Sequence, residues 1–349
     1  MLLALGVIAA VSGVGAWLVN LSLLNFSSGV FGVDQPNARS LHEQPTPRGG
    51  GLGIVAMLLL IAAPSMAWLG GHQLLAALLP PIIAIALVSY ADDRFSLPAW
   101  PRLFVHVLAA VWFVLNTGAM KQFAVPGEGF IFPELLATPF TVALIVWLTN
   151  LYNFMDGIDG LAGGMAIFGF GAIGLLAAGG SDWPGAALAV AVAGSAGGFL
   201  VLNFPPARLF MGDVGSSVLG FLAGAFIVRT QTTGTAPVWI GLLIFAPFVV
   251  DATVTIARRA LTGERIWEAH RTHFYQRWAA LSEGHKPTVL IEYALMFACA
   301  ASALVMIRSE TAFQWIGLVA WCGVFLALMI GVSLRERVAR QTAPERIGK

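Results

Sequence analysis

The chain has 349 residues, of which 58% are hydrophobic and 11% are charged, and its formal net charge is +1. This apolar share exceeds that of soluble globular domains, so the composition argues against a soluble enzyme and indicates an integral membrane protein. Cys299 and Cys322 both lie in apolar runs, which argues against a disulfide framework or a cysteine-based metal site. No nucleic-acid partner is expected.

Long apolar runs predict an all-α, polytopic fold. A helix that crosses a bilayer needs about 20 mostly apolar residues. The runs predict eleven membrane-spanning helices, near residues 2–24, 51–69, 74–91, 102–117, 136–152, 161–179, 185–203, 214–230, 236–256, 288–307 and 312–333. The run 102–117 is the weakest, so the expected number of spans is ten or eleven. No basic residue precedes the first run, which favours a retained helix over a signal peptide.

The distribution of basic residues predicts the orientation. With eleven spans and the N-terminus outside, only Lys121, Arg229 and Arg308 of the 19 basic residues fall outside. The positive-inside rule therefore predicts a cytoplasmic C-terminus. The loops are too short for a separate soluble domain, so residues 1–349 are expected to form a single transmembrane domain. The expected cytoplasmic loops lie near 25–50, 92–101, 153–160, 204–213 and 257–287.

Most aspartates are predicted to lie on the cytoplasmic side, together with most basic residues. Only Asp182 falls outside, whereas the other seven lie in cytoplasmic loops or at cytoplasmic helix ends: Asp34, Asp92, Asp93, Asp156, Asp159, Asp213 and Asp251. The positive-inside rule does not predict this, because acidic residues contribute little to topology. A shared acidic site on the cytoplasmic face does predict it.

The first two loops can be read in two ways. In residues 33–53, VDQPNARSLHEQPTPRGGGLG, prolines force an extended path and glycines allow close approach to backbone or phosphate. The alternative is a basic linker whose small residues pack helices. In residues 91–102, ADDRFSLPAWPR, Asp92 and Asp93 repel each other unless a cation is near. The alternative is an ordinary helix end.

The third loop carries the densest polar pattern. Residues 150–164 read NLYNFMDGIDGLAGG, and Asn150, Asn153 and Asp156 recur at a spacing of three, which places them on one helix face. Asp156-Gly157 and Asp159-Gly160 predict turns into the following span. Capping and turn formation alone would explain each residue but not all of them together.

The last two loops hold further candidates. In residues 203–217, NFPPARLFMGDVGSS, Asp213 begins a span, either as a cap or beside free N–H groups that could bind phosphate. Asp251 is expected to pair with Arg258 or Arg259. Residues 258–278 are basic and aromatic, and could form an amphipathic surface helix. On such a helix, His270 and His273 would be neighbours and could donate hydrogen bonds to phosphate. As zinc ligands they would lack the further cysteine or histidine ligands that zinc needs.

Taken together, these motifs resemble a known family. ADDR, NLYNFMDGIDGLAGG, FPPARLFMGDVGSS and HRTHFYQRW, in this order, resemble the polyprenyl-phosphate N-acetylhexosamine-1-phosphate transferases of glycosyltransferase family 4. The resemblance covers roughly residues 30–280. It implies ten or eleven transmembrane helices and transfer of a sugar 1-phosphate from a UDP-sugar to undecaprenyl phosphate, with release of UMP. It also implies Mg²⁺, with Mn²⁺ as a possible substitute, and a bacterial inner-membrane location.

The resemblance also assigns site residues. The expected catalytic residues are Asp92, Asp93, Asp156 and Asp159, and the expected Mg²⁺ ligands are Asp213 and Asn153. The expected substrate-binding residues are Asn150, Asn153, Arg39, Arg48, His270, Arg271 and His273. Scattered carboxylates suit Mg²⁺, which binds through one or two carboxylates plus substrate phosphates. In-line attack by the lipid phosphate is favoured over a covalent phospho-aspartate, because that phosphate is largely a dianion at neutral pH.

The branch of the family is open to two readings. HRTH replaces the histidine-rich triplet of the phospho-N-acetylmuramoyl-pentapeptide branch, and Arg39 with His42 stand near the place of its lysine. The sequence therefore looks more like members that initiate O-antigen or related surface polysaccharides. A transporter is the alternative from another class, but carriers place ionisable groups at the bilayer midplane and often show repeats. The donor sugar, the polymer and a possible homodimer remain open.

Overall fold

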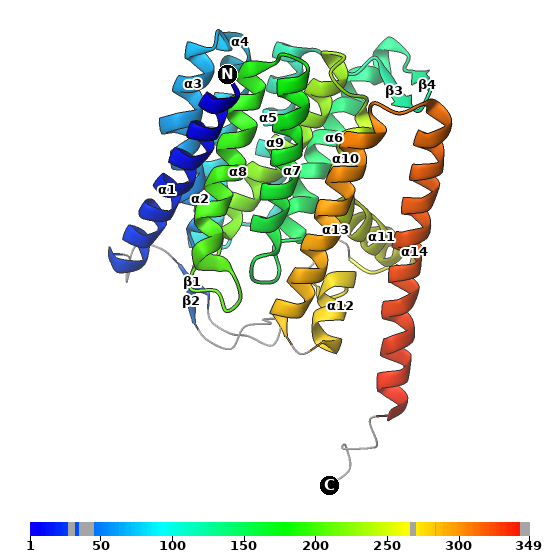
Figure 1. Ribbon diagram of the computed structural model, residues 1–349. Coiled ribbons are helices and arrows are strands. Elements are labelled where there is room, and N and C mark those ends of the chain that lie inside the picture. The colour runs from blue at the N-terminus through cyan, green and yellow to red at the C-terminus, as the bar shows by residue number, and fades with distance from the viewer. Residues whose placement is uncertain (27–31, 35–44, 266–269, 283, 343–349) are drawn as a thin grey trace.

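The structure is a computed structural model, and it describes residues 1–26, 32–34, 45–265, 270–282 and 284–342. Its helices form one bundle with two short hairpins (Figure 1). The helices are α1 (Leu2–Phe26), α2 (Gly50–Met57), the π-helical turn η1 (Leu58–Ala62), α3 (Ala63–Trp68), α4 (His72–Phe95), α5 (Ala99–Thr117), α6 (Glu134–Phe154), α7 (Leu161–Gly179), α8 (Trp183–Asn203), α9 (Gly212–Thr232), α10 (Val238–Ile244), α11 (Ala246–Leu261), α12 (Phe274–Leu281), α13 (His285–Met306) and α14 (Thr311–Thr342). The strands are β1 (Val33–Asp34), β2 (Thr46–Pro47), β3 (Gln122–Val125) and β4 (Glu128–Ile131), paired as β1–β2 and β3–β4.

The expected all-α, polytopic membrane fold is confirmed. Within the described residues, ten helices are long and apolar enough to cross a membrane. The segment α2–η1–α3 forms one of them, and the weakest predicted span corresponds to α5. The predicted span 236–256 is instead a broken pair, because α10 and α11 meet at an angle of 88° around Phe245. Since α10 packs on β3 and α11 packs on α12, this pair still connects the two ends of the bundle.

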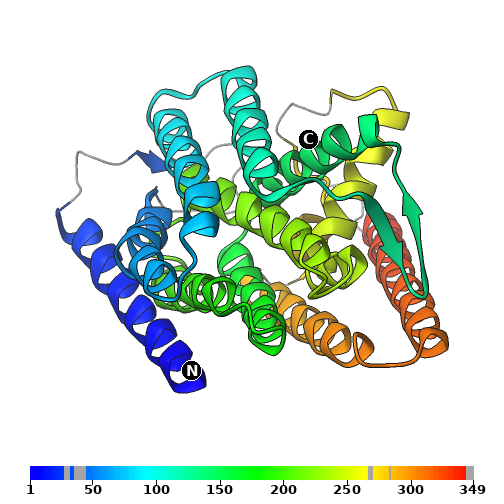
Figure 2. The same ribbon diagram turned by 90° about the horizontal axis from the view of Figure 1, so that it is seen from above.

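The most buried of the spanning helices is α9, which packs against α4 and α6 (Figure 2). Glycines on α9 allow α6 to approach closely. A Cβ atom on Gly220 would lie 2.7 Å from the Thr149 carbonyl oxygen, and one on Gly224 would lie 3.0 Å from Ile145 Cα. Small residues four apart are a common basis of close helix packing in membranes. This contact brings the C-terminal end of α6 beside the N-terminal end of α9.

This packing gives a stability prediction. Gly220→Ala should lower the free energy of unfolding by about 1–3 kcal/mol, because the new methyl group would meet the α6 backbone. Thermal unfolding in detergent would measure the change. Gly197→Ala on α8 is a matched control, since a Cβ atom there meets nothing within 4 Å. Equal unfolding temperatures for the two variants would contradict the close contact.

Charged residues lie at both ends of the bundle. We call one end the acidic end, after the aspartates at its helix ends: it holds β1–β2 and the adjoining ends of α4, α5, α6 and α9. The opposite end holds the hairpin β3–β4. There Arg229 forms a two-pronged ion pair with Asp182, at 2.8 and 2.9 Å. Two of the charged residues predicted to lie outside therefore neutralise each other.

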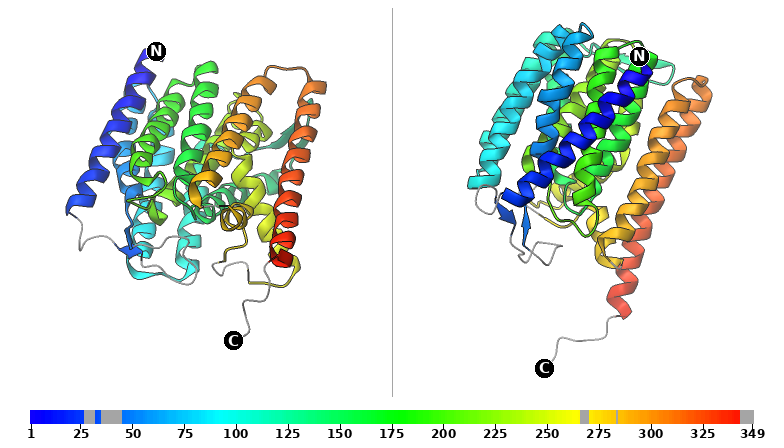
Figure 3. Two further views of the ribbon diagram at one scale, coloured as in Figure 1. Left: turned by 60° about the horizontal axis from the view of Figure 1, so that its bottom comes forward. Right: turned by 60° about the vertical axis from the view of Figure 1, so that its left-hand side comes forward.

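The segment between α11 and α13 differs from the expected long surface helix. Helix α11 ends at Leu261 and α12 begins at Phe274, so His270 and His273 precede α12 and do not share a helix face. Their rings nevertheless stack, with centroids 4.9 Å apart. Helix α14 extends past the other helices at the acidic end (Figure 3). Its Glu336 pairs with Arg277 of α12 at 2.6 Å.

Candidate active site

An arginine joins two aspartates at the acidic end. Arg102, in the first turns of α5, places Nη1 2.5 Å from Asp92 Oδ2 and 2.7 Å from Asp213 Oδ2. Asp92 belongs to the last turn of α4 and Asp213 to the first turn of α9. The bridge therefore fastens three helices at one point. The positive charge of Arg102 offsets the negative charges of two carboxylates that the sequence predicted to lie close together.

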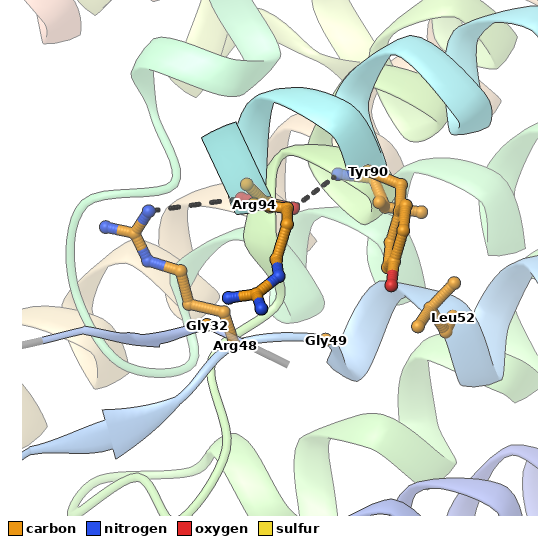
Figure 4. A pocket seen from close by; sticks show the side chains of 8 residues that line it. Gly32, Arg48, Gly49, Leu52, Tyr90 and Arg94 are labelled. Carbon is orange, nitrogen blue, oxygen red and sulfur yellow. Dashed lines mark hydrogen bonds and ion pairs between the residues drawn. The ribbon is translucent and has the colours of Figure 1, made fainter. Parts of the chain in front are cut away.

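Asp93 has a different environment from Asp92. Its carboxylate accepts hydrogen bonds from the backbone N–H groups of Asp213 and Val214, at 3.1 and 3.3 Å, and so caps α9 from outside. Arg48 Nη1 lies 4.0 Å from Asp93 Oδ1. Figure 4 shows Arg48 and Arg94 lining a small cavity beside Gly49 and Tyr90. Because Asp93 uses the first N–H groups of α9, it fixes the helix end that carries Asp213.

The glycines before α2 have a structural use. The N–H groups of Gly49 and Gly50 donate to the Phe210 carbonyl, and that of Gly51 donates to the Met211 carbonyl at 2.8 Å. A Cβ atom on Gly51 would lie 2.2 Å from the Gly215 backbone nitrogen. Of the two expected uses of these glycines, the structure therefore shows backbone approaching backbone. The first loop supports the segment that leads into Asp213.

Asn150 and Asn153 lie on α6, and Asp156 lies just beyond its end. The Asn153 Nδ2 donates to the hydroxyls of Ser216 and Ser217, at 3.1 and 3.3 Å. The Oδ1 of the same side chain receives no hydrogen bond from the described residues. The Asn150 amide donates to its own helix, to the Val146 carbonyl. The Asp156 carboxylate has no hydrogen-bond or ion-pair partner in the described part of the chain. Burial raises its pKa to about 7, and Asp213 and Asp93 add to the shift.

Asp159 belongs to a separate group of contacts. Its carboxylate accepts from the Ala207 N–H at 3.0 Å and lies 3.3 Å from His285 Nδ1. Asn203 works beside it: the Gly160 N–H donates to its Oδ1, and its own amide donates to the Leu209 carbonyl. These contacts hold the segment between α8 and α9 against the DGIDG turn. The expected catalytic part of Asp159 stays a prediction.

Asp251 holds the segment that contains His270, Arg271 and His273, which we call the histidine segment. This carboxylate accepts from His273 Nδ1 at 3.1 Å and from the N–H groups of Phe274 and Tyr275 at 3.0 and 2.9 Å. The expected pairing of Asp251 with Arg258 or Arg259 is therefore wrong. A pattern of charges along one helix could not reveal the capping of a distant helix.

The arginines near Asp251 contact other groups. Arg258 donates to the Thr272 carbonyl, and Arg259 pairs with Glu264. Arg271 is half-buried in the same segment as the two histidines. The Tyr275 hydroxyl donates to the Phe154 carbonyl at 3.2 Å, which links this segment to the loop that contains Asp156. The histidine segment and the third loop are thus neighbours at the acidic end.

The site suits a hard divalent cation that is completed by substrate oxygens. No three His, Cys, Asp or Glu side chains within the described ranges converge closely enough to hold a metal on their own. The Asp156 carboxylate and the Asn153 Oδ1, both near Asp213, receive no hydrogen bond from the described residues. Oxygen donors, few in number, are what Mg²⁺ uses when phosphates supply the remaining ligands. The residues therefore fit Mg²⁺.

Several site residues escaped the sequence analysis. Arg102 was counted only as a basic residue of a loop, although it follows the ADDR motif by eight residues. His106, one turn further along α5, is 3% exposed, and neither ring nitrogen makes a hydrogen bond of ordinary geometry with the described residues. Asn203 and Tyr275 gave no signal, because each acts through contacts distant in sequence. Arg39 and His42 lie outside the described residues.

The raised pKa of Asp156 gives a pH prediction. A folded-state pKa of about 7 exceeds the usual value, so the folded protein binds more protons than the unfolded chain between these two values. The unfolding temperature of the metal-free protein should therefore fall between about pH 4 and pH 7. Asp156→Asn should flatten this fall, as differential scanning fluorimetry would show. An unchanged pH profile in the variant would contradict the assignment.

Comparison with known proteins agrees with the motifs. The model of the family described as glycosyl transferase family 4 matches residues 75–231. A probable undecaprenyl-phosphate N-acetylglucosaminyl 1-phosphate transferase of Bacillus subtilis is 31% identical over 82% of this chain and 79% of its own length. A decaprenyl-phosphate N-acetylglucosaminephosphotransferase of Mycolicibacterium smegmatis is 30% identical over 75% of this chain and 72% of its own.

The other branch is also related. A phospho-N-acetylmuramoyl-pentapeptide-transferase of Heliobacterium modesticaldum is 30% identical over 75% of this chain and 84% of its own length. The similarity to each of the three covers at least 75% of this chain. The chain therefore belongs to glycosyl transferase family 4 and is one of its polyprenyl-phosphate N-acetylhexosamine-1-phosphate transferases.

Proposed function

We propose that this enzyme transfers N-acetylglucosamine 1-phosphate, or a closely related N-acetylhexosamine 1-phosphate, from a UDP-sugar to undecaprenyl phosphate. The observation that carries this proposal is the Asp92–Arg102–Asp213 bridge, with the Asp156 carboxylate and the Asn153 Oδ1 near it. Such a set of charges suits two anionic substrates and one cation. The names of the Bacillus and Mycolicibacterium relatives support the amino sugar.

In the proposed reaction, an oxygen of the lipid phosphate attacks the β-phosphorus of the UDP-sugar in line. The bond from that phosphorus to the bridging oxygen breaks, and UMP leaves with the electron pair. The products are UMP and undecaprenyl diphosphate-sugar. Because phosphoryl transfer depends mainly on positioning and charge stabilisation, no covalent enzyme intermediate is required. A trapped phospho-aspartate would argue against this direct route.

The residues of the candidate site would have different roles in this reaction. Asp92 and Arg102 would orient the lipid phosphate, with the Arg102 guanidinium offsetting its charge. Asn153 and Asp156 would face the donor, and His270 with His273 would donate hydrogen bonds to its diphosphate. Arg48 and Arg271 would complete the anionic contacts. Asp213, with Asn153, would hold Mg²⁺, which supplies charge neutralisation of the diphosphate and of the departing UMP.

We place the acidic end at the cytoplasmic face of the bacterial inner membrane. The positive-inside distribution supports this orientation, since sixteen of 19 basic residues then lie inside. A UDP-sugar is a cytoplasmic substrate, so the proposed donor fits the same side. Cysteine labelling of Gly157→Cys and Gly212→Cys in intact cells should report one shared compartment. Labelling of the two from opposite sides would exclude a common site.

The physiological role proposed is initiation of a surface polysaccharide such as O-antigen. The HRTH segment supports this branch over the muramoyl-pentapeptide branch, although both are related to the chain. A transporter, the alternative from another class, loses its basis because the chain belongs to a transferase family.

A donor panel tests the proposal. Purified protein would be incubated with undecaprenyl phosphate, Mg²⁺ and a set of UDP-amino sugars, including UDP-N-acetylmuramoyl-pentapeptide. We expect UMP release and lipid product with UDP-N-acetylglucosamine or a related N-acetylhexosamine donor, in strict dependence on the lipid. A preference for the pentapeptide donor would overturn the branch, and inactivity with every donor would overturn the function.

A further inference from the structure

A second cavity lies on the side of Asp251 and α12 that faces α13 and α14. It has a volume of about 510 Å³ and is lined by residues of α11, α12, α13 and α14. Small-molecule sites typically have volumes of about 300–1,000 Å³. Aromatic side chains form much of its wall, among them Phe274 and Trp278 of α12 and Trp321 and Phe325 of α14. The cavity is therefore large enough, and apolar enough, for part of an amphiphile.

The cavity opens toward the lipid-facing side of the bundle. Ile291 of α13 and Val324 and Leu328 of α14 line it, and they are 48%, 42% and 44% exposed. From Thr288 to Ala298 it follows α13 over a rise of about 15 Å. A ligand could thus enter sideways from the bilayer and lay a hydrocarbon chain along α13.

One acidic group in this wall is unexplained. Glu292 of α13 lines the cavity, and its carboxyl group has no hydrogen-bond or ion-pair partner among the described residues. It lies seven residues after His285, or about 10 Å into the helix. An ionisable side chain inside a membrane span is costly unless it is paired, so it marks a functional site by default.

The neighbouring charged groups are engaged with other partners. Asp251, which also lines the cavity, accepts from His273 and from two backbone N–H groups. Arg277 is paired with Glu336 of α14. The Arg335 guanidinium lies over the Trp278 ring, 4.5 Å from its centroid. None of these groups is therefore paired with Glu292 in the described part of the chain.

We propose that this cavity binds a membrane amphiphile that bears an ammonium group, such as an aminophospholipid, with the ammonium paired to Glu292. The ring of Trp321 provides a face that attracts a cation, and the apolar wall along α13 takes the hydrocarbon chain. Neither substrate of the proposed transfer carries this combination. The cavity is therefore a separate ligand site, not a part of the acceptor or donor site.

The site is connected to the histidine segment. Asp251, Phe274 and Tyr275 line the cavity, and Asp251 also holds His273 in place. A bound ammonium lipid would stabilise α12 between α11 and α14. Through α12 it would restrain His273, which the proposed function places at the donor diphosphate. An effect on KM for the donor is the expected consequence, and binding itself is independent of it.

Thermal unfolding with a matched series of probes tests the binding site. The purified full-length protein in a neutral maltoside detergent would be titrated with dodecylammonium or dodecanol. We expect the amine to raise the unfolding temperature, and the alcohol to require at least about tenfold higher concentration. Glu292→Gln should lose this preference, whereas Glu134→Gln, an exposed carboxylate at the opposite end, should retain it. Equal effects of amine and alcohol, or an unchanged preference in Glu292→Gln, would overturn the proposal.

A measurement on unmodified protein guards against a variant that fails to fold. The wild-type protein would be reconstituted in bilayers of phosphatidylethanolamine and phosphatidylglycerol, extracted again, and analysed by native mass spectrometry. Retention of phosphatidylethanolamine above its share in the bilayer is expected. Retention in proportion to the bilayer, or preference for phosphatidylglycerol, would contradict an ammonium site. Neither readout requires transferase activity, so failure here leaves the proposed function intact.

Discussion

Asp213→Asn should lower kcat by about 10³-fold while leaving the bundle folded. The carboxylate lies in the first turn of α9, where Asp93 caps the helix through the Asp213 and Val214 N–H groups. Those contacts use the backbone of Asp213, so they survive the substitution. What the variant loses is one negative oxygen donor facing Arg102 and the proposed cation. Its Mg²⁺ requirement should rise accordingly, as titration of UMP release with Mg²⁺ would show.

The control for Asp213→Asn is the same substitution type at a carboxylate on the opposite end of the bundle. Glu310→Gln changes the same chemical group at an exposed position between α13 and α14, and its turnover should match that of the wild type. Circular dichroism and the unfolding temperature of Asp213→Asn should also stay near the wild-type values. Full activity of Asp213→Asn would remove this residue from the metal site. Loss of the folded bundle would instead show that the carboxylate is chiefly structural.

Most of the fold could be predicted because it depends on local composition. The apolar runs and the side preference of arginines are properties of single segments, and ten predicted spans correspond to uninterrupted spanning segments in the described chain. The break at Phe245 could not be predicted in this way. Residues 236–256 are apolar on both sides of the bend, so hydropathy gives no sign of the 88° angle between α10 and α11.

The candidate site could be predicted only in part, for a related reason. Carboxylates and amides at helix ends stand out against an apolar sequence, so Asp92, Asp93 and Asp213 were found as candidates. Their roles depend on neighbours far away in the chain: Asp93 caps α9, 120 residues later, and Asp251 caps α12. Arg102 was not recognised because a basic residue near a membrane surface usually reflects topology. Only the folded arrangement shows it between two aspartates.

Arg102 also provides the prediction that separates charge compensation from metal binding. Arg102→Gln should lower kcat by about 10²-fold or more, because the cation that offsets the proposed lipid phosphate is lost. At the same time the Asp92 and Asp213 carboxylates lose their shared partner, so the site becomes more negative and should bind Mg²⁺ more tightly. The apparent Mg²⁺ constant should thus fall, opposite in direction to the change expected in Asp213→Asn.

Two control variants are needed to interpret the opposite changes of the apparent Mg²⁺ constant in Arg102→Gln and Asp213→Asn. Arg208→Gln removes an exposed arginine on the segment between α8 and α9, at the same end of the bundle, and should leave both kcat and the Mg²⁺ constant near wild type. Arg102→Lys keeps the charge but not the planar group that reaches two carboxylates, so it should recover only part of the activity. If Arg102→Gln and Asp213→Asn both weakened Mg²⁺ binding, the arginine would be holding the metal ligands in place, and its direct contact with phosphate would lose its support.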